Sequence, residues 1–216
     1  MDNLPLAAFF FVTWIGIFML ALAFFRIKFH TYVKPMLITV GLMTPLSWAL
    51  IQLMEIHEYF HMLNAPVEIG VATLCMHRLF KLSRTDSFMM VTLSYGIVVF
   101  MENVTSMIVN DYQMDRASIA LASGIMHQEW FFAFLIFLLS YAMLSLRLGF
   151  TVVRRHVQPA MSKRFRIVLV LTFCSVWFSN IIVHFVGELL LLSTYLMFFI
   201  FGYLCIRLYR QELEED

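Results

Sequence analysis

The sequence predicts an all-α integral membrane protein, a polytopic bundle of seven transmembrane helices. Two observations predict the membrane: of the 216 residues, 62% are apolar and only 13% are charged, whereas soluble domains are about 45–50% apolar and about 25% charged. A third observation, the distribution of Lys and Arg along the chain, sets the number of helices. The composition excludes a water-soluble globule, and the basic residues form no stripe that would indicate a nucleic-acid partner.

Six apolar segments are long enough to cross a hydrocarbon core, which takes about 20 helical residues. A seventh segment has a shorter apolar stretch, because it contains Glu68 and His77. Hydropathy leaves this segment undecided, and the placement of charge decides in its favour. The seven expected spans are residues 6–25, 35–54, 63–80, 87–109, 130–149, 166–186 and 189–206.

The residues before the first span and after the last span indicate how the chain begins and ends. The N-terminus lacks the basic residues of a secretory signal, so we expect the first apolar segment to be retained as a span. Residues 207–216 are rich in Glu and in helix-forming side chains, so they should prolong the last span as a short charged helical tail. Because there is no internal repeat and no Pro/Gly-rich linker, residues 1–216 should form a single transmembrane domain.

The basic residues indicate how the spans are oriented. Three Lys or Arg fall in the first loop, three in the third, six in the fifth and two in the tail, so that 14 of the 15 lie on one side and only Arg116 lies in an even-numbered loop. Basic loops stay in the cytoplasm. The N-terminus should therefore be outside and the C-terminus cytoplasmic. The acidic residues in or beside the even loops give the same orientation: Glu55, Glu58, Glu68, Asp111, Asp115, Glu129 and Glu188.

The sharpest local motif is His57-Glu58-Tyr59-Phe60-His61, an H-E-x-x-H match at the outer end of the second span. On one helix, two His four residues apart share a face and can bind one Zn²⁺ while the Glu activates a water. A third ligand would come from His127 or His184. The alternative interpretation is that these are polar residues where a helix emerges into water, and then no cofactor is needed.

A second group of polar residues points to a ligand site open to the outside. In the sixth span, Asn180, His184 and Glu188 are spaced four residues apart, and Glu102 and Asn103 lie at comparable depth in the fourth span. Ionisable groups within spans face the bundle interior, a cavity or a partner. The alternative is that these side chains only fix helix packing, or that Glu188 faces water.

Residues 73–106 give the chain a family resemblance. The run Thr-Leu-Cys-Met-His-Arg-Leu-Phe-Lys-Leu-Ser-Arg-Thr-Asp-Ser, followed by a span that contains Glu102-Asn103, resembles the membrane sensor module of peptide-pheromone receptor histidine kinases of Gram-positive bacteria. The layout of six or seven spans with a charged helix starting at Arg207 is similar too. That family continues into a phosphoacceptor His and an ATP-binding domain, whereas this sequence ends at Asp216.

The resemblance implies a kinase-less receptor, a truncated sensor module or a small partner of a larger complex in a bacterial cell membrane. We therefore expect a membrane receptor that binds an extracellular ligand, for example a peptide, and signals to a protein partner or a second copy. The alternatives are an intramembrane zinc hydrolase with Glu58 as catalytic residue, and a structural subunit. The partners common to all three are membrane lipids. With 23 Phe, 16 Met, 8 Gly and 5 Pro, the composition is bulky and poor in helix breakers, whereas channels and transporters use Gly-lined close packing and broken helices.

Overall fold

The computed structural model describes residues 3–57, 60–123, 126–146, 148–150, 163–185 and 187–215. These residues form eight α-helices and one 3-10 turn, with no strand among them. The helices are α1 (Asn3–Phe24), α2 (Phe29–Ile56), α3 (His61–Leu79), α4 (Arg84–Val109), α5 (Met114–Ser123), α6 (Met126–Ser145), α7 (Lys163–Phe185) and α8 (Leu190–Glu215), and the 3-10 turn is η3 (Gly187–Leu189).

The all-helical prediction is confirmed, and five helices are long and apolar enough to cross a membrane: α1, α2, α4, α7 and α8. Two other helices, α3 and α6, coincide with the expected spans 63–80 and 130–149 but fall outside this group. In α3 the apolar run is interrupted by Pro66 and Glu68. In α6 the apolar part is the short stretch Trp130–Ser145.

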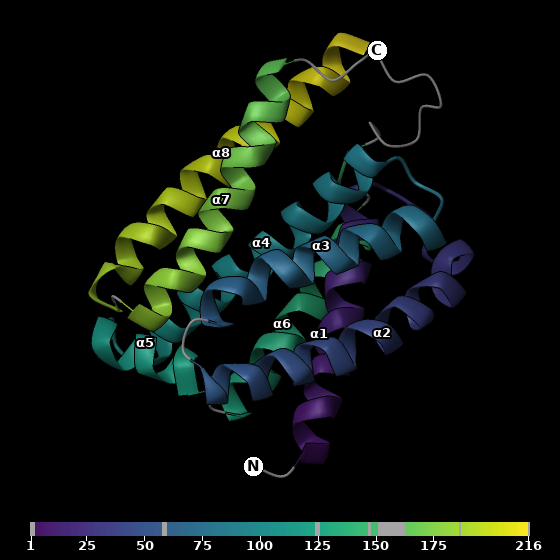
Figure 1. The fold of residues 1–216 in the computed structure, drawn as a ribbon. Helices are drawn as coiled ribbons and strands as arrows, with labels where there is room; N and C mark the ends of the chain where they lie inside the picture. The colour runs from purple at the N-terminus through teal and green to yellow at the C-terminus, as the bar shows by residue number, and fades with distance from the viewer. Residues whose placement is uncertain are drawn as a thin grey trace.

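Helix α4 lies at the centre of the bundle (Figure 1). It contacts α1, α3, α5, α6, α7 and α8, while α1 packs against α2, α4 and α6. The last two long helices, α7 and α8, lie side by side and lean on α3 and α4. Because most of α4 is covered by other helices, its buried polar side chains need partners inside the protein rather than in water.

A glycine in α4 allows α4, α7 and α8 to pack closely. A Cβ atom at Gly96 of α4 would lie 2.0 Å from Cζ of Phe201 in α8 and 2.8 Å from Cγ2 of Val176 in α7. Both neighbours are buried. Only a residue without a side chain lets the three helices meet at this distance.

A capping residue starts α4 one turn earlier than the expected span. Ser83 has extended backbone, and its hydroxyl accepts a hydrogen bond of 3.1 Å from the backbone N–H of Asp86. The Ser83 hydroxyl also donates to the Asp86 carboxylate at 2.6 Å. Since a Ser side chain that accepts from the third residue of a helix satisfies an otherwise unpaired N–H, the helix begins at Arg84 and includes the polar turn before residue 87.

One element was not expected from the sequence. Helix α5, ten residues long, is too short to span a membrane, and it packs against α4, α7, η3 and α8. The hydroxyl of Ser106 in α4 donates a hydrogen bond of 3.0 Å to the carbonyl of Ala117 in α5. This contact holds α5 across the end of α4.

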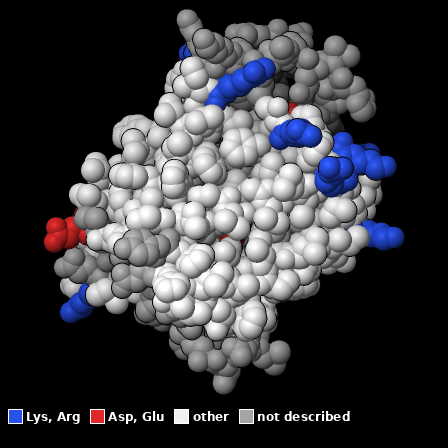
Figure 2. Space-filling model, in the orientation of Figure 1, with Lys and Arg blue, Asp and Glu red and all other residues white. Residues whose placement is uncertain are grey.

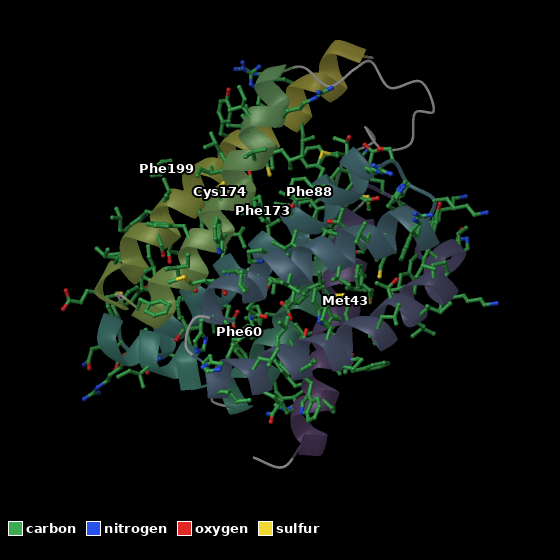
Figure 3. The ribbon with its side chains drawn as sticks, viewed as in Figure 1. Met43, Phe60, Phe88, Phe173, Cys174 and Phe199 are labelled. Atoms are coloured by element: carbon green, nitrogen blue, oxygen red, sulfur yellow. The ribbon has the colours of Figure 1, made fainter. Side chains whose placement is uncertain are left out.

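The surface is apolar around the middle of the bundle. Figure 2 shows most of the Lys and Arg in view toward the upper right of the visible face and one at the lower left, with a broad, largely uncharged region between them. Figure 3 shows Phe199 on the outer side of α8, where 69% of this residue is exposed. At the edge of the core, the half-buried rings of Phe88 in α4 and Phe173 in α7 lie with their centroids 5.6 Å apart. Aromatic side chains therefore serve both as core and as the surface that lipid would cover.

Candidate functional site

Four consecutive helices each contribute one polar side chain to a buried chain of hydrogen bonds, here called the Glu68 network. The indole N–H of Trp14 in α1 donates to Oγ of Ser47 in α2 at 2.9 Å. The Ser47 hydroxyl donates to Oε1 of Glu68 in α3, and the Tyr95 hydroxyl of α4 donates to Oε2 at 2.7 Å. None of the four residues is more than 7% exposed.

The Glu68 network places a carboxyl group where its charge is poorly compensated. Both oxygens of Glu68 accept hydrogen bonds, and both donors are neutral hydroxyls. A buried carboxylate loses several kcal/mol of hydration, by order of magnitude, and normally regains it from a cationic partner. A carboxyl group held in this way can bind a cation or a proton, and it can hold four helices in one arrangement.

A second polar contact joins α4 to α7. The side-chain amide of Asn103 donates a hydrogen bond of 2.9 Å to the hydroxyl of Ser179, and both residues are buried. Beside it, Asn180 donates to the carbonyl of Val176 in its own helix at 3.0 Å. The structure therefore brings Asn103 next to the part of α7 that contains Asn180, although the residue that Asn103 contacts is Ser179.

The other members of the expected ligand group lie in different surroundings. Glu102 is partly exposed and lies two helical turns after Tyr95 on α4. Glu188 is exposed in η3. Because α7 ends at Phe185, Glu188 does not continue the helical stripe of Asn180, which corrects the expected alignment. The side chain of His184 lies outside the described part of the structure.

The helix that should carry the zinc motif ends at Ile56, just before the motif. His57 is exposed and has extended backbone after the end of α2, and His61 is the first residue of α3. The two His residues therefore do not share the face of one helix, and that part of the prediction is wrong. Glu58 and the side chain of His127 lie outside the described residues. Within the part of the chain described, no three His, Cys, Asp or Glu side chains come together. Zinc binding itself stays a prediction.

A proline explains one more contact between distant helices. Pro66 lies inside α3, and because proline has no N–H, the carbonyl four residues earlier, that of Met62, has no helical donor. The indole N–H of Trp177 in α7 donates to this carbonyl at 2.6 Å. Trp177 thus replaces the missing helical hydrogen bond and attaches the first turn of α3 to α7.

Sequence reasoning missed the Glu68 network. Glu68 was expected among the acidic residues of the outer surface, but it is only 6% exposed. The available signal was the presence of Ser47, Glu68 and Tyr95 within three apolar segments. Nothing in the sequence says that these positions meet, because their contact depends on the helix rotations set by packing. Comparison with protein-family models, with curated proteins and with solved structures gives no match.

Proposed function

We propose that the chain is a membrane receptor or sensor module of a bacterial cell membrane. It would bind an extracellular ligand, for example a peptide, and pass the signal to a cytoplasmic or membrane partner. The observation that supports this most is the buried contact between Asn103 of α4 and Ser179 of α7, because it connects the central helix to the pair α7–α8, which continues as a charged helix to Glu215. The resemblance to peptide-pheromone sensor modules agrees with this proposal.

The proposal includes seven spans, with the N-terminus outside and the C-terminus in the cytoplasm. In support, the first turn of α1 and the last turn of α8 lie at opposite ends of the bundle (Figure 1). An odd number of crossings is needed for that. Most of the Lys and Arg visible in Figure 2 lie toward one end, which agrees with cytoplasmic odd loops. In this arrangement α3 and α6 also cross the membrane, and Glu68 of α3 and Ser140 of α6 are buried against neighbouring helices.

In the proposed mechanism the ligand acts on the ends of α4, α5 and α7 that face outside. A ligand shifts a receptor only if it binds the two conformations with different free energies. The hydrogen bond from Asn103 to Ser179 is a contact whose geometry changes when α7 moves against α4. Movement of α7 would be carried by its close packing with α8 to the tail after Arg207, where the partner would bind.

The proposal is tested by the response of the full chain to a peptide fraction prepared from spent medium of a dense culture of the source organism. The readout is a fluorescent reporter at Tyr209, an exposed residue near the end of α8. We expect a change that disappears when the fraction is treated with protease. Asn103→Ala should weaken the response, whereas Asn180→Ala, which removes a hydrogen bond within α7 only, should affect it less. Ion or solute flux through vesicles containing the protein would contradict a receptor role.

A further inference from the structure

The Glu68 network has features that go beyond a packing role and do not depend on the receptor proposal. The carboxyl group lies between α1, α2, α3 and α4, and its described partners are the hydroxyls of Ser47 and Tyr95. Ser47 and Tyr95 donate directly to the carboxyl oxygens, and Trp14 donates to Ser47. None of these three donors carries a positive charge.

Within the described part of the chain, the hydrogen-bond partners of Glu68 include no cationic group. On α4 the facing groups are Tyr95 and, beyond it, Glu102, which is itself acidic. On α3 the two described imidazoles, His61 and His77, lie seven and nine residues away at the ends of the helix. The contacts from α1 and α2 are Trp14 and Ser47, which are neutral, and the described contact from α7 to α3 is the indole of Trp177.

Two buried side-chain oxygens, each one helical turn before Glu68 or Tyr95, have no hydrogen-bond partner among the described residues. Oδ1 of Asn64 is buried and has no hydrogen-bond partner among the described residues, and Asn64 lies one helical turn before Glu68. Side chains four residues apart on a helix are neighbours. Oγ1 of Thr92, a fully buried residue one turn before Tyr95, also has no partner there. A protonated Glu68 would place an O–H donor one helical turn from Asn64.

We propose that Glu68 is a proton-binding site inside the bundle. The carboxyl group binds a proton while α1–α4 are packed as in this structure, and it releases the proton when movement of α3 admits water. A proton removes the uncompensated charge and leaves both oxygens able to accept from Ser47 and Tyr95. The bound species is a proton rather than a metal cation, because the hydroxyls of Ser47 and Tyr95 direct hydrogen atoms, not lone pairs, at the carboxyl oxygens.

Infrared difference spectroscopy on the full chain in lipid vesicles tests this directly. Spectra recorded between acidic and alkaline buffers should contain a carboxylic-acid C=O band that is lost in Glu68→Gln and retained in Glu188→Gln, which changes an exposed carboxylate. Glutamine has the same shape and can still accept from one hydroxyl. Absence of the band at every pH at which the helices remain folded would overturn the proposal.

A second measurement needs no substitution. A membrane-permeant carbodiimide reacts with a protonated carboxyl group, taking up its proton as the carboxyl oxygen adds to the carbodiimide carbon. Mass spectrometry of the wild-type protein should locate the adduct on Glu68, with less adduct in alkaline buffer. Protection by sodium ions at constant pH would overturn the proposal in favour of a metal-cation site. Equal labelling at all pH values would overturn it as well. Neither result would bear on ligand sensing at Asn103 and Ser179.

Discussion

Trp177 in α7 and Met62 in α3 are 115 residues apart, yet the indole N–H of Trp177 donates a hydrogen bond of 2.6 Å to the Met62 carbonyl. That carbonyl lacks a helical donor because residue 66 is proline. In lipid a bare carbonyl is costly, so the contact does more than fill space. It attaches α3, which contains Glu68, to α7, which contains Ser179.

Trp177→Phe should destabilise the bundle by about 1–2 kcal/mol, because it leaves the Met62 carbonyl without a donor. Pro66→Ala restores an N–H at position 66, so Trp177→Phe should have a smaller effect in that background. Thermal unfolding in detergent, followed by circular dichroism, measures both effects. Trp130→Phe, at an exposed position on α6, is the control. If Trp177→Phe lowers the stability equally with and without Pro66, the indole contributes packing only.

Tyr95→Phe should destabilise the protein by about 1–3 kcal/mol, since Oε2 of Glu68 would then be buried with no donor from α4. Tyr141→Phe removes the same hydroxyl from a residue that is 69% exposed and should have almost no effect. Denaturant unfolding in detergent distinguishes them. If the two variants unfold alike, the Glu68 network contributes nothing measurable to stability.

Gly96→Ala should be destabilising by about 1–3 kcal/mol, because the new methyl group overlaps Phe201 and Val176. The matched control is Gly202→Ala in α8, where a Cβ atom would meet nothing within 4 Å. Phe201→Leu should partly restore the stability lost in Gly96→Ala, because the shorter side chain leaves room for the new methyl group. The variants can be ranked by resistance to proteolysis in detergent, and a tolerated Gly96→Ala would mean that α4, α7 and α8 are less closely packed than described.

The orientation in the membrane can be checked by labelling single cysteines in a background without Cys75, Cys174 and Cys205. Gln113→Cys, in the exposed turn between α4 and α5, should react with an impermeant reagent added to intact cells. Lys81→Cys, in the exposed turn between α3 and α4, should react only after the cells are opened. Labelling of both positions from the same side would contradict the seven-span proposal.

The helices were largely predictable, because long apolar segments and turns marked by charge or by a cap determine them locally. Each of the seven expected spans overlaps one helix, and α8 continues through the charged residues after Arg207. Helix α5 was missed because a ten-residue amphipathic segment between two spans has no hydropathy signal of its own. The break after Ile56 was missed because the H-E-x-x-H spacing is equally compatible with one continuous helix.

The candidate site was less predictable than the fold. The expectation that the fourth and sixth spans meet at the depth of Asn103 agrees with the contact to Ser179, since both positions lie at similar distances from the ends of their helices. The Glu68 network depends instead on how α2, α3 and α4 are rotated about their axes. Close packing around Gly96 and the link from Trp177 to α3 help to set these rotations, and neither follows from the pattern of a single segment.

The most direct test of the receptor proposal is a distance measurement across the bundle. Spin labels at Gln113→Cys and Tyr209→Cys, both exposed, report on the α5 end of α4 and on the end of α8. When the peptide fraction from spent medium is added, the distance between the two labels in lipid vesicles should shift in the labelled protein that carries no further substitution. The shift should be reduced when Asn103→Ala removes the donor to Ser179. An unchanged distribution with the peptide fraction, or an equal shift in the Asn103→Ala variant, would contradict signalling through the contact between α4 and α7.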